Sequence, residues 1–207
     1  MDKILILGGS GHAKVVLDLI ESTYKYRIVG FVDKGVGEVL GFPIVGDDSV
    51  LNDFFYKGVK YASIGIGDNF IRGKLYESLK ELGYNIPRLI HNTAIVSNYA
   101  LIGEGTNILP GVMINASAQI GENCIINTGA IIEHDCKIGN NVHISPGAKL
   151  AGGIIIGNNT HIGIGATIMQ NIVIGDNVII GAGAVVIDNI PNNAVCVGVP
   201  AKIIKYR

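Results

Sequence analysis

Several features are scarce or absent in this sequence, and each absence excludes a class of protein. The chain has no tryptophan, only 16% of its 207 residues are charged, and its formal net charge is −1. A nearly neutral chain has no basic surface with which to bind nucleic acid or an anionic membrane. No apolar run reaches the ~18–20 residues that a membrane-spanning helix requires. We therefore expect a cytoplasmic protein that neither binds nucleic acid nor inserts into a membrane.

The cysteines are too few for a disulfide framework and have no metal-ligand spacing. Cys124, Cys136 and Cys196 are an odd number, and we expect them to be buried free thiols in a reducing compartment. The N-terminal stretch "MDKILILGG" passes from a short apolar run directly into glycines. It predicts a first strand, because a signal peptide would carry a longer apolar region and a cleavage site.

The sequence does contain many glycines, 29 in all, and a repeat of six residues. An aliphatic residue recurs at every sixth position, namely Val96, Ile102, Ile108, Ile114, Ile120, Ile126, Ile132, Ile138, Ile144, Leu150, Ile156, Ile162, Ile168, Ile174, Ile180 and Val186. A small or β-branched residue follows each by four positions, and Cys124 and Cys136 belong to that second series. A period of six fits neither a helix nor a lone strand. It indicates short strands separated by corners, where glycine and asparagine adopt left-handed dihedrals, and coils that stack into a solenoid.

In the predicted solenoid, the residues directly before the core aliphatics also stack into columns, and one of these columns contains two histidines. If each coil has 18 residues, Ile125, His143, His161 and Ile179 stack at intervals of ~4.8 Å. Strand alternation points these side chains away from the core. Exposed isoleucines beside two histidines predict a face that another protomer covers. The alternative is a set of scattered surface aliphatics, which are common.

Residues 1–90 have a different pattern, in which β and α segments alternate. We expect a strand, a glycine loop and a helix within residues 3–22, strands at 27–33 and 61–69, and a helix at 71–83 that Gly83 closes. The loop residues Ser10–His12, Asp33 and residues 67–69 would meet at one sheet edge, which predicts a nucleotide site. Lys14 occupies the third glycine position of a dinucleotide fingerprint, which favours a mononucleotide or nucleotide sugar over NAD. The alternative is that these glycines only turn the chain.

This two-part organisation, with the motifs "GGSGH", "INTGAIIEHDCKIG", "VHISPGAKLAGG" and "VGVPAK", resembles the bacterial sugar-nucleotide acetyltransferases. The nearest resemblance is to members that N-acetylate UDP-4-amino-4,6-dideoxy sugars in the bacillosamine pathway. Perosamine N-acetyltransferases and sialic acid O-acetyltransferases have the same layout. The resemblance implies an α/β Rossmann-like domain at 1–90, a left-handed parallel β-helix at 91–191, and a tail at 192–207 near the acetyl-CoA groove. It also implies a homotrimer with active sites between subunits, acetyl-CoA as co-substrate and no metal.

The resemblance also implies roles for individual residues. His134 corresponds to the general base, Asp135 to the acid that raises its basicity, and Asn127 to a polar residue near the reacting centre. His143, Ile164 and Ala182 correspond to acetyl-CoA contacts. The residues that correspond to nucleotide-sugar contacts are Ser10, Gly11, His12, Asp33, Lys34 and Gly67. Lys34 departs from an acidic pair at the end of the second strand.

The stretch "IIEHDCKIG" places His134 between Glu133 and Asp135. Transfer of an acetyl group to an amine requires an acceptor for the amine proton, and histidine titrates near neutral pH. A carboxylate on the other ring nitrogen would fix the tautomer and stabilise the imidazolium. Either acid could serve from chemistry alone, and only the resemblance selects Asp135.

Three other functions are compatible with the pattern. The enzyme could acetylate a sugar hydroxyl, such as that of a sialic acid, where a base matters more than for an amine. A prism enzyme could instead hold a metal with His134, His143 and His161. A non-catalytic binder of nucleotide sugars could have kept the fold, although the intact E-H-D argues against it.

Overall fold

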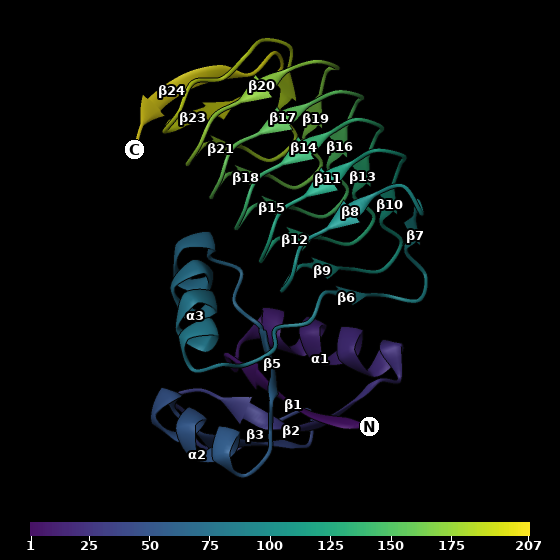
Figure 1. The fold of residues 1–207 in the computed structure, drawn as a ribbon. Coiled ribbons are helices and arrows are strands. Elements are labelled where there is room, and N and C mark those ends of the chain that lie inside the picture. Colours follow the sequence, from purple (N-terminus) through teal and green to yellow (C-terminus); the bar gives the residue numbers. More distant parts are fainter. The chain divides into compact units, whose positions relative to one another are not determined.

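The computed structural model describes residues 1–207, which divide into two compact units, Met1–Asn92 and Thr93–Arg207 (Figure 1). The first unit has alternating strands and helices, and the second consists of short strands and corners. Both units therefore have the classes of structure that the sequence predicts. No helix is long and apolar enough to cross a membrane.

The first unit contains a five-stranded sheet in the order β3-β4-β2-β1-β5. Its strands are β1 (Asp2–Leu7), β2 (Tyr26–Val32), β3 (Glu38–Val39), β4 (Phe42–Gly46) and β5 (Tyr61–Ile64). The helices are α1 (Gly11–Thr23), α2 (Leu51–Tyr56) and α3 (Asn69–Glu81), and a short strand β6 (Leu89–Ile90) follows. The central strand β1 runs parallel to both β2 and β5. The carboxyl ends of these three strands therefore lie at one edge of the sheet.

Local sequence explains the two long helices of this unit. Helix α1 buries an apolar stripe that includes Val16, Leu19 and Ile20, as its spacing predicts. At the start of α3, the Asp68 carboxylate accepts hydrogen bonds from the first-turn amides of the helix, and Gly83 follows its end with φ 84°. The sequence pattern predicts these two helices but gives no signal for α2 or for the β3–β4 hairpin.

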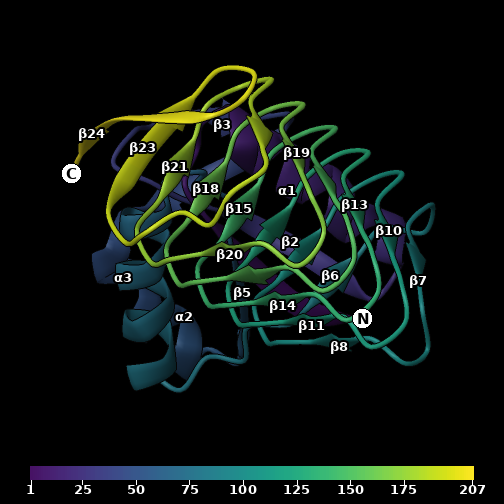
Figure 2. The same cartoon turned by 90° about the horizontal axis from the view of Figure 1, so that it is seen from above.

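The second unit is a parallel β-helix whose coils have three faces. Face A contains β9 (Asn107–Ile108), β12 (Ile125–Ile126), β15 (His143–Ile144), β18 (His161–Ile162) and β21 (Ile179–Ile180). Face B contains β7 (Ile95–Val96), β10 (Met113–Ile114), β13 (Ile131–Ile132), β16 (Lys149–Leu150), β19 (Thr167–Ile168) and β22 (Val185–Val186). Face C contains β8 (Leu101–Ile102), β11 (Gln119–Ile120), β14 (Lys137–Ile138), β17 (Ile155–Ile156) and β20 (Val173–Ile174). Figure 2 shows the successive coils from above.

The predicted coil length of 18 residues is confirmed by the strand register. On face A, Ile125 pairs with His143, and His143 pairs with His161. The corners also have the predicted residues. Between faces A and B the left-handed position is always glycine, as at Gly129 (φ 66°), and between faces C and A it is mostly asparagine, as at Asn141 (φ 58°).

The repeating aliphatics fill the interior of the coil. Ile126, Ile144 and Ile162 are fully buried, and so are the small residues of the second series. Cys124, Cys136 and Cys196 are buried free thiols, as expected.

The expectation that face A exposes isoleucines was wrong. Ile125 is 0% exposed, His143 is 9% exposed, and Ile179 is partly buried in a single chain. Strand alternation determines only that these side chains leave the core, and other parts of the chain then cover them. Exposure of this column therefore gives no argument for a second protomer.

Residues 192–207, expected to form a tail, contain two strands that extend face A. Strand β23 (Ala194–Val197) pairs in parallel with β21, and β24 (Lys202–Tyr206) pairs with β23 in the antiparallel sense.

Substitution of the buried Thr160 tests how much its side-chain hydrogen bonds stabilise the stacked coils. The Thr160 hydroxyl donates to the Gly175 carbonyl at 2.8 Å and accepts from the Val178 amide at 3.0 Å. Thr160→Val keeps the shape but leaves both backbone groups without this partner, so we expect the free energy of unfolding to fall by ~1–3 kcal/mol. Urea denaturation measures this change.

The matched control for that variant is Thr167→Val, at an exposed position on β19. It should change stability by less than ~0.5 kcal/mol. Equal stability losses in the two variants would show that the buried hydroxyl has no special role.

Candidate active site

The E-H-D segment forms the corner between β13 on face B and β14 on face C. Ile132 and Cys136 anchor the corner in the core, and both are fully buried. Between them the side chains of His134 and Asp135 are 63% and 64% exposed. Asp135 occupies the left-handed position of the corner, with φ 60°. The repeat thus holds two polar side chains at a fixed place on the surface.

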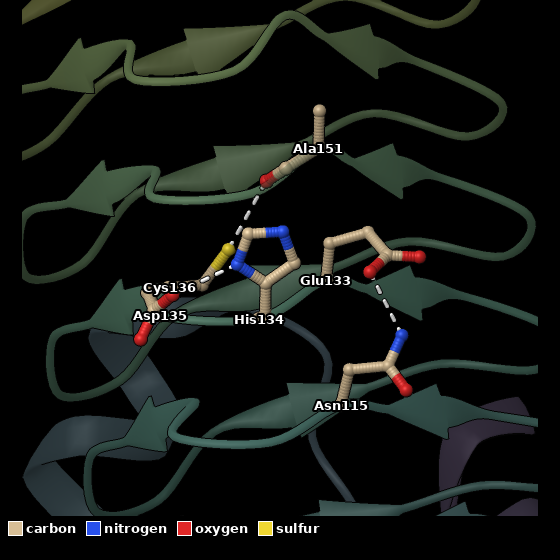
Figure 3. A network of polar contacts seen from close by, with 6 residues as sticks. All are labelled: Asn115, Glu133, His134, Asp135, Cys136 and Ala151. Atoms are coloured by element: carbon tan, nitrogen blue, oxygen red, sulfur yellow. Dashed lines mark hydrogen bonds and ion pairs between the residues drawn. The ribbon is translucent and has the colours of Figure 1, made fainter.

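Asp135, and not Glu133, contacts the imidazole of His134 (Figure 3). The distance from His134 Nδ1 to Asp135 Oδ2 is 2.8 Å. The Glu133 carboxylate instead accepts a hydrogen bond from the Asn115 amide at 2.9 Å. A carboxylate on Nδ1 favours the tautomer with the proton on Nδ1, which leaves the Nε2 lone pair as a proton acceptor. This arrangement suits a general base.

Cys136 lies beside this pair but is unsuited to nucleophilic catalysis. Its thiol donates to the Ala151 carbonyl at 3.2 Å. Burial raises the pKa of the Cys136 thiol, and the negative charges of Glu133 and Asp135 contribute in the same direction. The thiolate is therefore disfavoured.

A second group of candidate residues lies on face A and at the corner between faces A and B. The Asn127 amide nitrogen is 3.1 Å from His143 Nε2. The rings of His143 and His161 pack edge to face, with 4.8 Å between their centroids. Ile164 and Ala182 are exposed at this same corner, one coil apart. The chain therefore brings Asn127 to His143 and not to His134, which occupies a different corner.

In the first unit, the predicted strand ends do meet at the carboxyl edge of the sheet. The Gly9 amide donates to the Asp33 carboxylate, which joins the glycine loop to the end of β2. Ser10 and Gly11 are exposed at the start of α1, and Lys34 is exposed beside Asp33. Asp33 thus braces the loop whose amides would face an anion.

Arg72 is a residue of this edge that the sequence analysis missed. It is 1% exposed, and its guanidinium donates to the Gly67 carbonyl at 3.0 Å and to Asn69 Oδ1 at 2.8 Å. These bonds fix the loop that contains the predicted contact Gly67. Its spacing was the signal that could have indicated its burial. Arg72 precedes the buried Tyr76 and Leu79 by four and seven positions, so the three residues share one face of α3.

His12 lies at the same edge in a buried environment. Burial lowers the pKa of its imidazole to about 4, and the positive charge of Arg72 contributes to this shift. His12 is therefore neutral at physiological pH. Within the chain, no group of three or more His, Cys, Asp or Glu residues could hold a metal ion.

Comparisons with known proteins place both units in known families. Residues 3–79 match the PglD N-terminal domain, and residues 99–134, 117–152 and 153–188 match the bacterial transferase hexapeptide. Perosamine N-acetyltransferase from Caulobacter crescentus, solved with CoA and GDP-perosamine, is 38% identical, with a TM-score of 0.97. That match covers 99% of this chain and 98% of the other. The chain belongs to the hexapeptide-repeat sugar N-acetyltransferases.

Other relatives of this N-acetyltransferase family support the same placement. The acetyltransferase domain of PglB from Neisseria gonorrhoeae FA1090 is 36% identical, with a TM-score of 0.95, and the match covers 99% of this chain and 100% of that one. UDP-N-acetylbacillosamine N-acetyltransferase from Bacillus subtilis (strain 168) is 38% identical over 113 residues, 53% of this chain. The match spans 52% of that curated relative, about half its length. The predicted family and its left-handed parallel β-helix are thereby confirmed.

The partly buried His12 predicts a pH-dependent stability for this protein. In the unfolded chain the imidazole titrates near ~6.5, whereas its pKa in the folded chain is about 4. Between these two pKa values the unfolded state binds more protons than the folded state. The free energy of unfolding should therefore fall as the pH falls from ~6.5 towards ~4. Below pH ~4, His12 should cause no further loss of stability. His12→Gln should flatten this slope in urea denaturation series.

An NMR titration checks the same prediction directly. The His12 resonances should remain constant from pH 8 to pH 5, because the pKa of its imidazole in the folded chain is about 4. A His12 transition near pH 6.5 in the folded protein would contradict the prediction.

Proposed function

We propose that this protein transfers the acetyl group of acetyl-CoA to the amine of a nucleotide-linked 4-amino-4,6-dideoxy sugar, with His134 as general base. The single observation that carries the proposal is the 2.8 Å contact of His134 Nδ1 with Asp135. It occurs in a chain that matches an N-acetyltransferase solved with CoA and GDP-perosamine along nearly its whole length. We favour a UDP-linked sugar, in accordance with the bacillosamine motifs.

The chemistry requires one base and no acyl-enzyme. The neutral amine nitrogen attacks the thioester carbonyl, a C–N bond forms and the C–S bond breaks. Nε2 of His134 accepts the proton that the amine loses, and the departing thiolate of CoA accepts a proton to leave as the free thiol. Asp135 stabilises the imidazolium that exists between these two transfers.

The proposed acetyl-CoA contacts and the proposed base lie at two different corners of the prism. Ile164 and Ala182 provide an exposed small and apolar strip that suits the pantetheine arm of acetyl-CoA, at the same corner as Asn127 but in later coils. Because His134 occupies a different corner of the prism, one chain does not present both groups to one substrate. We infer a homotrimer in which His134 of one subunit meets the second group of its neighbour.

The carboxyl edge of the first unit is the proposed site for the nucleotide part. The amides of Ser10 and Gly11 at the start of α1 suit a phosphate group. The neutral His12 can donate or accept a hydrogen bond without adding charge. Asp33, Lys34 and Gly67 complete this set, with Asp33 and Arg72 holding the loops in place.

The deciding experiment measures release of CoA thiol from acetyl-CoA with a panel of acceptors. We expect turnover with a UDP-linked 4-amino-4,6-dideoxy sugar, and lower kcat/KM with the GDP-linked counterpart. Mass spectrometry should find one acetyl group on the amine nitrogen. Turnover only with a CMP-linked sialic acid or free sugars would refute the proposal in favour of O-acetylation, and no turnover at all would favour a binding protein.

Substitutions of His134 and of the two neighbouring acids test whether His134 is the base and Asp135 its partner. His134→Ala should lower kcat by ~10²–10⁴-fold. Asp135→Asn removes the carboxylate proposed to hold the ring and stabilise the imidazolium, so kcat should fall by ~10–100-fold. Glu133→Gln is the matched control, because Glu133 bonds to Asn115, and its kcat should change by less than about threefold. Steady-state kinetics at saturating acetyl-CoA measures all three, and a larger loss for Glu133→Gln than for Asp135→Asn would reverse the assignment.

A further inference from the structure

We propose that Gly152 is a positioning residue for His134, because only a residue without a side chain leaves room for the imidazole beside Asp135. The catalytic consequence rests on the proposed function, whereas the steric relation does not. Gly152 lies 18 residues after His134 and therefore one coil beyond it. The Gly153 amide donates to the His134 carbonyl at 2.9 Å, which fixes the spacing of the two corners.

The imidazole lies against the space that a side chain at position 152 would fill. A Cβ atom on Gly152 would be 2.6 Å from Cε1 of His134, 2.7 Å from Nε2 and 3.2 Å from Nδ1. Carbon atoms in ordinary contact are ~3.5–4.0 Å apart. Even the methyl group of alanine would thus overlap the edge of the ring that carries the proposed catalytic nitrogen.

The backbone itself does not require glycine at this position. The left-handed residues of this corner are Ser117, Asp135, Gly153 and Asn171, each one position later. The residues that correspond to Gly152 in the other coils include Asn98, Ala116, His134 and Gln170, and all of these carry a Cβ atom. Glycine occurs only in the coil directly beyond the histidine. Its distinguishing feature is therefore the contact with the imidazole.

A substitution at Gly152 should move the base without unfolding the coil. The His134 side chain is 63% exposed, so the ring can rotate towards solvent to escape the added methyl group. This rotation separates Nδ1 from Asp135, which now lies 2.8 Å away. Gly152→Ala thus acts on the same interaction as Asp135→Asn, through the orientation of the ring. Gln170→Ala, at the same corner position two coils beyond His134, is the matched control.

The first test needs no substrate. Long-range ¹H–¹⁵N NMR spectra report the imidazole tautomer, and His134 in the unmodified protein should favour the proton on Nδ1. Gly152→Ala should abolish this preference, and Gln170→Ala should leave it unchanged. A folded Gly152→Ala protein with the original tautomer would overturn the proposal.

The second test is kinetic and uses the acceptor that the unmodified protein acetylates. Gly152→Ala should lower kcat by roughly 10²-fold, the effect of a misplaced catalytic group, with little change in KM. The effects of Gly152→Ala and Asp135→Asn should not multiply, because both remove one contact. Independent, multiplying effects would refute positioning through Asp135. If the unmodified protein acetylates nothing while the tautomer shifts as expected, the proposed function fails and the steric role of Gly152 stands.

A stability measurement covers the case in which Gly152→Ala perturbs the fold. Any fall in the Tm should disappear when Gly152→Ala is combined with His134→Ala, because removal of the ring removes the clash. A Tm that stays low in the double variant would place the clash in the backbone and overturn the proposal.

Discussion

The hydrogen-bonded register between coils is the constraint on which this structure depends. Up to β22, each strand residue of the prism pairs with the residue 18 positions later, as Ile125 with His143 and His143 with His161. Backbone hydrogen bonds between successive coils fix this spacing. The position of a residue in the repeat, and not its type, therefore determines which residues lie above and below it. The buried aliphatic columns supply the driving force for stacking, and the register converts it into defined positions at the surface.

The corners are where this scaffold accepts functional residues at small cost. A left-handed residue occupies the third position of most corners, and the repeat usually provides glycine or asparagine there. Asp135 occupies this place at φ 60°, which aspartate tolerates better than most residues do. The strain is modest, and Ile132 and Cys136 remain in the core on either side. His134 and Asp135 are therefore carried by rigid elements, as the proposed site requires.

The sequence was sufficient for the parts of the structure that are periodic or locally signalled. The repeat predicted the coil length, the core and the burial of Cys124 and Cys136, because each coil contacts only its neighbours. It could not predict the burial of Ile125, because strand alternation shows only that this side chain leaves the core. It also could not choose between Glu133 and Asp135, since that choice depends on side-chain directions at a corner. Arg72 was missed because a cation inside an apolar helical stripe reads as a surface residue until its carbonyl partners are known.

In a single chain, the contact between His134 and Asp135 is open to water. A hydrogen bond between two side chains that are 63% and 64% exposed competes with water, and its electrostatic contribution is small. The same pair becomes stronger where water is excluded, and proton transfer to Nε2 then proceeds in a fixed environment. The residues that suit acetyl-CoA lie at another corner of the prism, so a neighbouring subunit that brought them to His134 would also remove the water. In the proposed trimer, assembly would in this way bring the proposed acetyl-CoA contacts to His134 and also lower the dielectric around the proposed base.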